Sequence, residues 1–136
     1  MVMRTLRLVF LTLGMVTLMN ADVFELRTYY AMPGKLQALH SRFRNHTLKL
    51  FEKHGMNNVG YWAPTDQAKK PGMPDKGNTL IYVLRHKSRE AATASWKAFR
   101  EDPEWIKARD ASEKDGKLVD HVDAVFMEAV DYSPMK

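Results

Sequence analysis

The chain has 136 residues, a formal net charge of +5, 45% hydrophobic residues and 27% charged residues, which is the composition of one globular domain. The absence of cysteine excludes disulfides, thiolate metal sites and a cysteine nucleophile. Basic residues alternate with acidic ones, as in SEKDGK, so no stripe of positive charge predicts nucleic-acid binding.

The first 21 residues are typical of an export signal. The start, MVMRTLR, is basic, an apolar or weakly polar run (LVFLTLGMVTLM) follows, and Asn20-Ala21 precedes the acidic Asp22. The run is shorter than the roughly 20 apolar residues of a membrane span. We therefore predict that residues 1–21 are removed and that a mature domain, residues 22–136, is periplasmic or secreted without a membrane span. A mitochondrial presequence is the rival interpretation, but the segment lacks serine and is apolar all round.

The rest of the chain alternates between strand and helix patterns. Segments rich in β-branched and aromatic residues predict strands over residues 23–30, 56–63, 78–86 and 117–132. Helices are predicted over residues 35–54 from apolar spacing, over 88–101 with Ser88 as N-cap, and over 102–114 with an Asp-Pro-Glu start. The proline-rich residues 64–77 predict a loop.

This order, β-α-β-β-α-β, predicts an α+β, ferredoxin-like fold in which helices cover one face of an antiparallel sheet. The strands are nevertheless apolar on both faces. In residues 78–86, for example, Leu80, Tyr82 and Leu84 alternate with Ile81 and Val83. An uncovered apolar sheet face is an association site, so we predict a homodimer packed sheet to sheet.

A series of short motifs between Glu25 and Trp62 resembles the start of the NIPSNAP family. They are E-L-R-T-Y, P-G-K-L, R-F-x-x-H-T, F-x-K-H-G and V-G-Y-W, in this order. The similarity weakens through the proline-rich loop and resumes at Leu80-Ile81-Tyr82, at Trp96 and at Asp102-Pro103-Glu104-Trp105. It covers essentially all of residues 22–136.

The resemblance implies a dimeric α+β barrel, and it implies less about chemistry. The family has no settled catalytic activity, and some eukaryotic members are mitochondrial and act through protein partners. The wider superfamily includes cofactor-free monooxygenases, haem-degrading enzymes and isomerases. The export signal departs from the mitochondrial picture, so those partner roles are not carried over to this chain.

The polar residues of the first helix fall into two sets. On a helical wheel, His40, Thr47 and His54 lie inside the apolar stripe, whereas Arg42 and His46 lie along its edge. If the inward set is purely structural, its side chains form hydrogen bonds with the backbone. Thr47 would then bond a carbonyl of its own helix, and His54 would cap the end of that helix. Their functional interpretation is a pocket between helix and sheet, where His40 or His46 would be the catalytic general base.

Glu25 and Arg27 point to the same face of the first strand. If that face lines the dimer interior, the two charges must pair with each other or across the interface, because a lone buried charge is costly. The pair is then a structural ion pair, or an anion site at Arg27 with Glu25 as proton acceptor.

The residues predicted to contact a ligand are polar and aromatic side chains of these segments: Glu25, Arg27, Tyr29, Arg42, Thr47, Tyr61, Trp62 and Trp96. The histidines lack the spacing of a metal site, and no phosphate-binding loop or dinucleotide fingerprint is present. No metal and no cofactor is therefore expected.

Three hypotheses of function remain open. The first is a homodimeric module that binds a small apolar or aromatic ligand or a protein partner. The second is a cofactor-independent oxygenase or isomerase that uses His40 or His46 as its base. The third is a haem-handling protein with one of these histidines as axial ligand.

Overall fold

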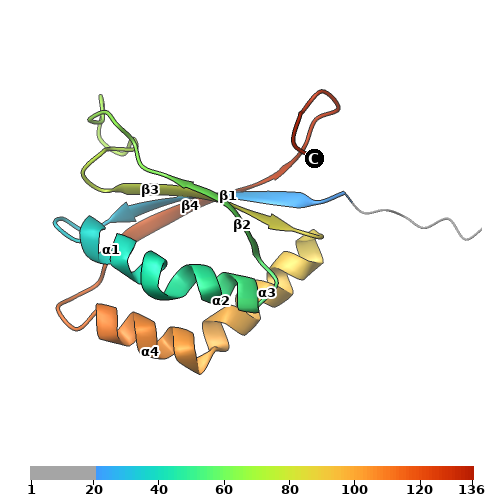
Figure 1. Cartoon of the computed structure of the whole chain (residues 1–136). Helices are drawn as coiled ribbons and strands as arrows, with labels where there is room; N and C mark the ends of the chain where they lie inside the picture. The colour runs from blue at the N-terminus through green and yellow to red at the C-terminus, as the bar shows by residue number, and fades with distance from the viewer. Residues whose placement is uncertain (1–20) are drawn as a thin grey trace, which may run out of the picture.

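The computed structural model describes residues 21–136, which form a four-stranded sheet with helices on one face (Figure 1). The elements are β1 (Val23–Ala31), α1 (Leu36–Arg42), η1 (Phe43–Thr47), α2 (Leu48–Lys53), β2 (Asn57–Trp62), β3 (Thr79–His86), α3 (Arg89–Glu101), α4 (Pro103–Ser112) and β4 (Val119–Glu128). The strand order is β2-β3-β1-β4, with antiparallel neighbours. The predicted ferredoxin-like α+β fold is confirmed.

Two sequence expectations concern the membrane and the N-terminal signal. Within residues 21–136, no helix is both long and apolar enough to cross a membrane. The predicted signal, except for Ala21, lies outside the described residues.

Both predicted helix caps are present. Ser88 Oγ accepts a hydrogen bond from the backbone N–H of Ala91 at 3.0 Å, and Asp102 Oδ1 accepts one from that of Glu104 at 2.8 Å. Each such cap contributes about 1 kcal/mol, because it satisfies a backbone donor that the first helical turn leaves free.

Asp102 also joins α4 to the end of α2. Its Oδ2 lies 2.8 Å from Lys53 Nζ and 2.7 Å from His54 Nε2. The hydrogen bonds from Lys53, His54 and the Glu104 backbone hold the pKa of Asp102 well below its usual range. His54 therefore has the structural role of a tie between helices.

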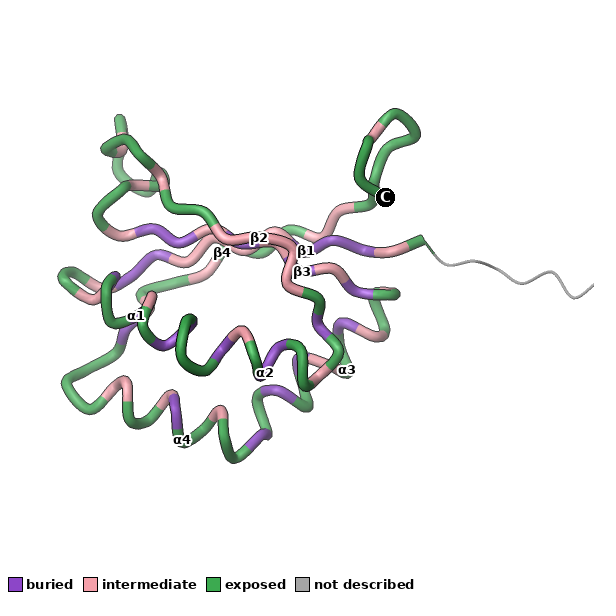
Figure 2. The backbone as a smooth tube through the Cα atoms, in the orientation of Figure 1, coloured by how far each residue is buried: buried purple, intermediate pink, exposed green. Residues whose placement is uncertain are grey.

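The core lies between the helices and the face of β1 and β3 that they cover (Figure 2). Leu39, Tyr82 and Leu84 are fully buried there, and the Phe51 and Phe99 rings are 4.9 Å apart. Since burying one large apolar side chain contributes about 1.5–3 kcal/mol, this layer supplies most of the driving force for folding.

The predicted helix 35–54 has a π-helical centre. In η1 the helix widens, and the backbone N–H of Leu48 bonds the carbonyl of Phe43 five residues earlier. Thr47 Oγ1 likewise donates to the carbonyl of Arg42 at 3.3 Å. The wheel of 100° per residue nevertheless placed Thr47, Leu50 and Phe51 correctly on the inner side, since all three are buried. It placed Arg42 on the helix edge, whereas that side chain is buried because α4 covers this side.

The predicted last strand is too long. β4 ends at Glu128, and the next residues form a turn in which the backbone N–H of Ser133 bonds the carbonyl of Val130 at 3.0 Å. This C-terminal segment and the loop between β2 and β3 both project from the sheet on the side away from the helices (Figure 1).

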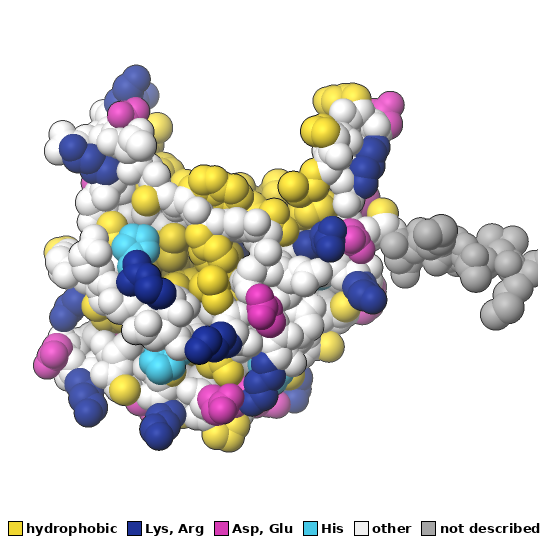
Figure 3. Space-filling model, in the orientation of Figure 1, with side chains coloured by type: hydrophobic (Ala, Val, Ile, Leu, Met, Phe, Trp, Pro, Cys, Tyr) yellow, Lys and Arg dark blue, Asp and Glu magenta, His cyan; other side chains and the backbone are white. Residues whose placement is uncertain are grey.

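The outer face of the sheet, opposite the helices, is apolar and open. Trp62 and Val125 are each 53% exposed on it. Figure 3 shows hydrophobic side chains gathered between the two projections. The two-faced apolar pattern of the strands is thus real.

Candidate functional site

A buried carboxylate organises the inner face of the sheet. Glu25 on β1 is 1% exposed and accepts three hydrogen bonds. The donors are Arg27 NH1 to Oε1 at 2.7 Å, His86 Nε2 to Oε2 at 2.9 Å and Trp96 Nε1 to Oε2 at 2.7 Å. One side chain therefore connects β1, β3 and α3.

The three donors keep Glu25 ionised. Burial alone would raise the pKa of this carboxyl, but the hydrogen bonds from His86, Trp96 and Arg27 and the charge of Arg27 outweigh burial and lower the pKa. Both oxygens are occupied, so the carboxylate is not a free proton acceptor. This face of the sheet carries the helices, so the condition of a dimer interior is not met and Glu25 pairs with Arg27 of the same chain.

Arg27 is held in place by Glu25 but is not fully enclosed. Its guanidinium carbon lies 4.3 Å from the ring centroid of Trp96, and its side chain is 19% exposed. Its Nε has no hydrogen-bond partner among the described residues. On β4, Ala124 stands opposite Arg27 and is exposed, so the site is open toward that edge of the sheet.

His86 is a member of this cluster that the sequence analysis missed. Its Nδ1 is buried and has no partner within residues 21–136. Because the Glu25 carboxylate accepts from Nε2, neutral His86 carries its proton there and presents a lone pair at Nδ1. The signal was available in the sequence: His86 continues the inward alternation of Leu80, Tyr82 and Leu84.

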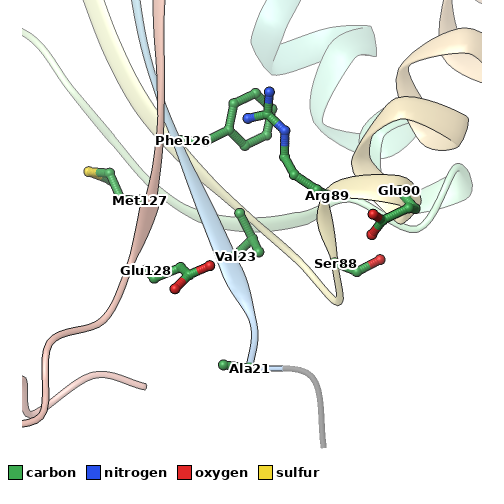
Figure 4. A pocket seen from close by; sticks show the side chains of 8 residues that line it. All are labelled: Ala21, Val23, Ser88, Arg89, Glu90, Phe126, Met127 and Glu128. Carbon is green, nitrogen blue, oxygen red and sulfur yellow. The ribbon is translucent and has the colours of Figure 1, made fainter. Parts of the chain in front are cut away.

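A cavity of about 890 Å³ adjoins the cluster, where β1 and β4 meet the start of α3 (Figure 4). Phe126 stands opposite Glu25 in the strand register, and its ring centroid is 6.2 Å from that of His86. The Arg89 guanidinium carbon lies 3.4 Å from the centroid of the Phe126 ring, and Figure 4 shows the side chain extended across this ring.

The cavity combines an apolar wall with charges of both signs. Val23 and Phe126 supply the wall, and the charged residues in the lining are Arg89, Glu90 and Glu128. Such a site can hold a flat or apolar body and bind an anionic group through Arg89.

Two further predicted ligand residues pack beside the cluster. The ring centroids of Tyr29 and Tyr61 lie 5.3 Å and 5.1 Å from that of Tyr82, and both rings also contact Phe43 of η1. The Tyr61 hydroxyl donates to Asn58 Oδ1 at 2.5 Å. The buried Tyr82 hydroxyl has no partner within the described chain.

The other predicted site residues lie elsewhere. His40 is half-buried on α1, where burial and the nearby Arg44 charge lower its pKa, and it is not part of the cavity lining. His46 is exposed and faces α4. Thr47 bonds its own helix, and Trp62 lies on the outer face.

Among the described residues, no three His, Asp or Glu side chains are grouped so that they could hold a metal ion.

The NIPSNAP family model matches residues 24–134. The chain belongs to the NIPSNAP family. No curated protein matches it in sequence.

Solved structures show the same fold. A NIPSNAP family protein from Agrobacterium tumefaciens, of unknown function, aligns over 86% of this chain and 96% of its own, with 18% identity and a TM-score of 0.67. An uncharacterised NIPSNAP-like domain protein from Burkholderia xenovorans aligns over 85% and 90%, with 14% identity and a TM-score of 0.66.

A third similar structure is a Streptomyces coelicolor monooxygenase in complex with nanaomycin D. It aligns over 82% of this chain and 89% of its own, with 17% identity and a TM-score of 0.54. At this identity the likeness concerns the fold alone.

We expect Glu25→Gln to lower the free energy of unfolding by about 3 kcal/mol at neutral pH, because the part-buried Arg27 then loses the buried carboxylate with which it is paired. Urea denaturation measures the change, with the exposed Glu90→Gln as control, for which less than about 0.5 kcal/mol is expected. Because the folded-state pKa of Glu25 is lowered, the ionised side chain stabilises above its unfolded pKa. The gap between native protein and Glu25→Gln should therefore shrink as the pH falls below about 5. A pH-independent gap would contradict this account.

Proposed function

We propose that this NIPSNAP protein is an exported homodimeric module that binds a small molecule in the cavity between the sheet and α3. The ligand has an apolar or aromatic body and an anionic group. The observation that carries the proposal is the stacking of Arg89 on Phe126 beside the fixed Glu25 cluster. This arrangement offers an aromatic surface and a guanidinium without a carboxylate partner within residues 21–136.

The dimer is proposed from the outer face of the sheet. A hollow of about 470 Å³ lies on that face, lined mainly by apolar side chains such as Phe24, Trp62, Val83 and Met127. The projecting C-terminal segment also lines it, through Val130 and Met135. A second copy presenting the same face would cover the exposed area of both chains.

An enzyme is the second candidate, and His86 is the residue that favours it. An imidazole oriented by a carboxylate, with a lone pair free on its other nitrogen, is a suitable general base. None of His86, His40 and His46 is in the cavity lining. A cofactor-independent oxygenase or isomerase reaction would then use His86, because it is buried directly next to Phe126 of the cavity wall, with the two ring centroids 6.2 Å apart. The fold of the Streptomyces coelicolor monooxygenase supports this candidate only in architecture.

Light scattering tests the dimer. At micromolar concentration we expect twice the monomer mass for the native chain and the monomer mass for Val125→Glu, because the substitution places a charge on the exposed apolar face. Ile106→Glu is the control, since Ile106 is an exposed apolar residue of α4. A native monomer, or equal dissociation by both substitutions, would contradict the sheet-to-sheet dimer.

Titration with 1-anilinonaphthalene-8-sulfonate, an aromatic anion, tests the cavity. We expect Arg89→Gln to weaken binding roughly fivefold, because the sulfonate loses a charge-assisted hydrogen bond. Arg100→Gln makes the same change at the other end of α3 and should leave the affinity unchanged. Equal affinities of the two variants for the probe would mean that it binds outside the cavity.

A separate assay distinguishes the enzyme. If the native protein chemically converts a hydroxynaphthalene and His86→Asn does not, the enzyme is favoured over the binding module.

The mature N-terminus tests export. When the full chain is expressed in bacteria, mass spectrometry of the extracytoplasmic fraction should find a chain that begins at or near Asp22, because cleavage is predicted after Ala21. A cytoplasmic chain that retains residues 1–21 would overturn this part of the proposal.

A further inference from the structure

A groove runs between the first helical segment and α4, on the side of the helices away from the sheet. Two hollows of about 420 Å³ and 430 Å³ form it, and both are lined by Asn45, His46, Ala108 and Ala111. Because the hollows share these residues, they make one continuous depression, which we call the α4 groove. It is separate from the cavity beside Phe126, with no lining residue in common.

The local geometry of η1 shapes one wall of the groove. Asn45 and His46 belong to this π-helical segment and are exposed. Opposite them, α4 presents the small side chains of Ala108 and Ala111, which leave space between the helices. π-helical turns inside α-helices occur frequently at functional sites.

The charges along the groove are predominantly positive. Lys49 and Lys107 line one end and make no ion pair with any residue of 21–136. The only acidic residue in the lining, Glu104, is already engaged by Lys53 Nζ at 2.9 Å. An anionic partner would therefore meet two uncompensated ammonium groups.

Arg42 provides a cation at the other end. Its side chain is 4% exposed, and its NH1 donates to Ser112 Oγ at 3.3 Å and Glu113 Oε1 at 3.1 Å. Its Nε, however, is buried and has no acceptor among the described residues. A buried donor without a partner destabilises the folded chain, so a carboxylate that accepts from Nε at this end would satisfy an unpaired donor.

The length of the groove favours a peptide as its occupant. From Glu104 to Ser112 the axis of α4 rises about 12 Å. An extended chain spans about 13 Å over four residues, so acidic side chains at positions i and i+4 reach both ends. In an extended chain the side chain at i+2 faces the same way as those at i and i+4, toward Ala108 and Ala111, and those at i+1 and i+3 face away. We propose that the α4 groove binds an extended segment of a partner protein that carries two acidic residues four positions apart.

Fluorescence polarisation tests this proposal with a fluorescein-labelled peptide of glutamate, three alanines and glutamate, with both ends blocked. We expect saturable binding at low salt that weakens at least fivefold in Lys49→Gln/Lys107→Gln. The matched control is Lys69→Gln/Lys70→Gln, which removes two exposed lysines of the β2–β3 loop and should leave binding unchanged. Because all four lysines are exposed, both variants should fold.

Three binding results would overturn the proposal, and so would one pattern of amide shifts. The binding results are equal binding of a peptide with glutamine in both glutamate positions, equal loss of binding in both lysine variants, and absence of saturable binding. Backbone amide shifts of Ala108 and Ala111 on peptide addition would support the groove, whereas shifts confined to the cavity around Phe126 would reject it. Arg89→Gln should not change peptide affinity, so failure of the small-molecule proposal and failure of this one are distinguishable.

Discussion

The arrangement of the inner face depends on one buried negative charge. A carboxylate without partners would be neutralised or expelled in this environment, because removing it from water is costly. The three donors that prevent this come from β1, β3 and α3, so the charge also fixes how α3 lies on the sheet. The position of α3 in turn sets the opening beside Phe126. The ion pair is thus both structural and the foundation of the candidate site.

The sequence predicted much of this fold because its signals are local. Alternating apolar residues predicted the four strands, and Ser88 and Asp102 predicted two helix starts through a bond each makes within a few residues. The pairing of Glu25 with Arg27 was also predictable, since residues two apart on a strand share a face. The sequence alone did not predict whether this pair faces the helices or the open side of the sheet, because the residues on both faces of β1 are compatible with burial.

The site was harder to predict because its members meet only after folding. His86 and Trp96 lie 61 and 71 residues beyond Glu25 in the chain. Arg42 was assigned to a helix edge because the wheel considered one covering surface, the sheet, whereas α4 supplies a second. The histidines that stood out in the sequence, His40 and His46, are exposed or half-buried instead.

The π-helical turn has a consequence for how this helix tolerates change in length. It accommodates one residue more than an α-helical turn would, so the two halves of the helix are offset by about 100° of rotation. Deleting one residue from 43–47 would restore regular geometry yet turn α2 about its axis. His54 would then face away from Asp102, and the tie between α2 and α4 would be lost. The irregular turn therefore lets both halves of the helix pack into the core, through Leu39 before it and Phe51 after it, while His54 reaches Asp102.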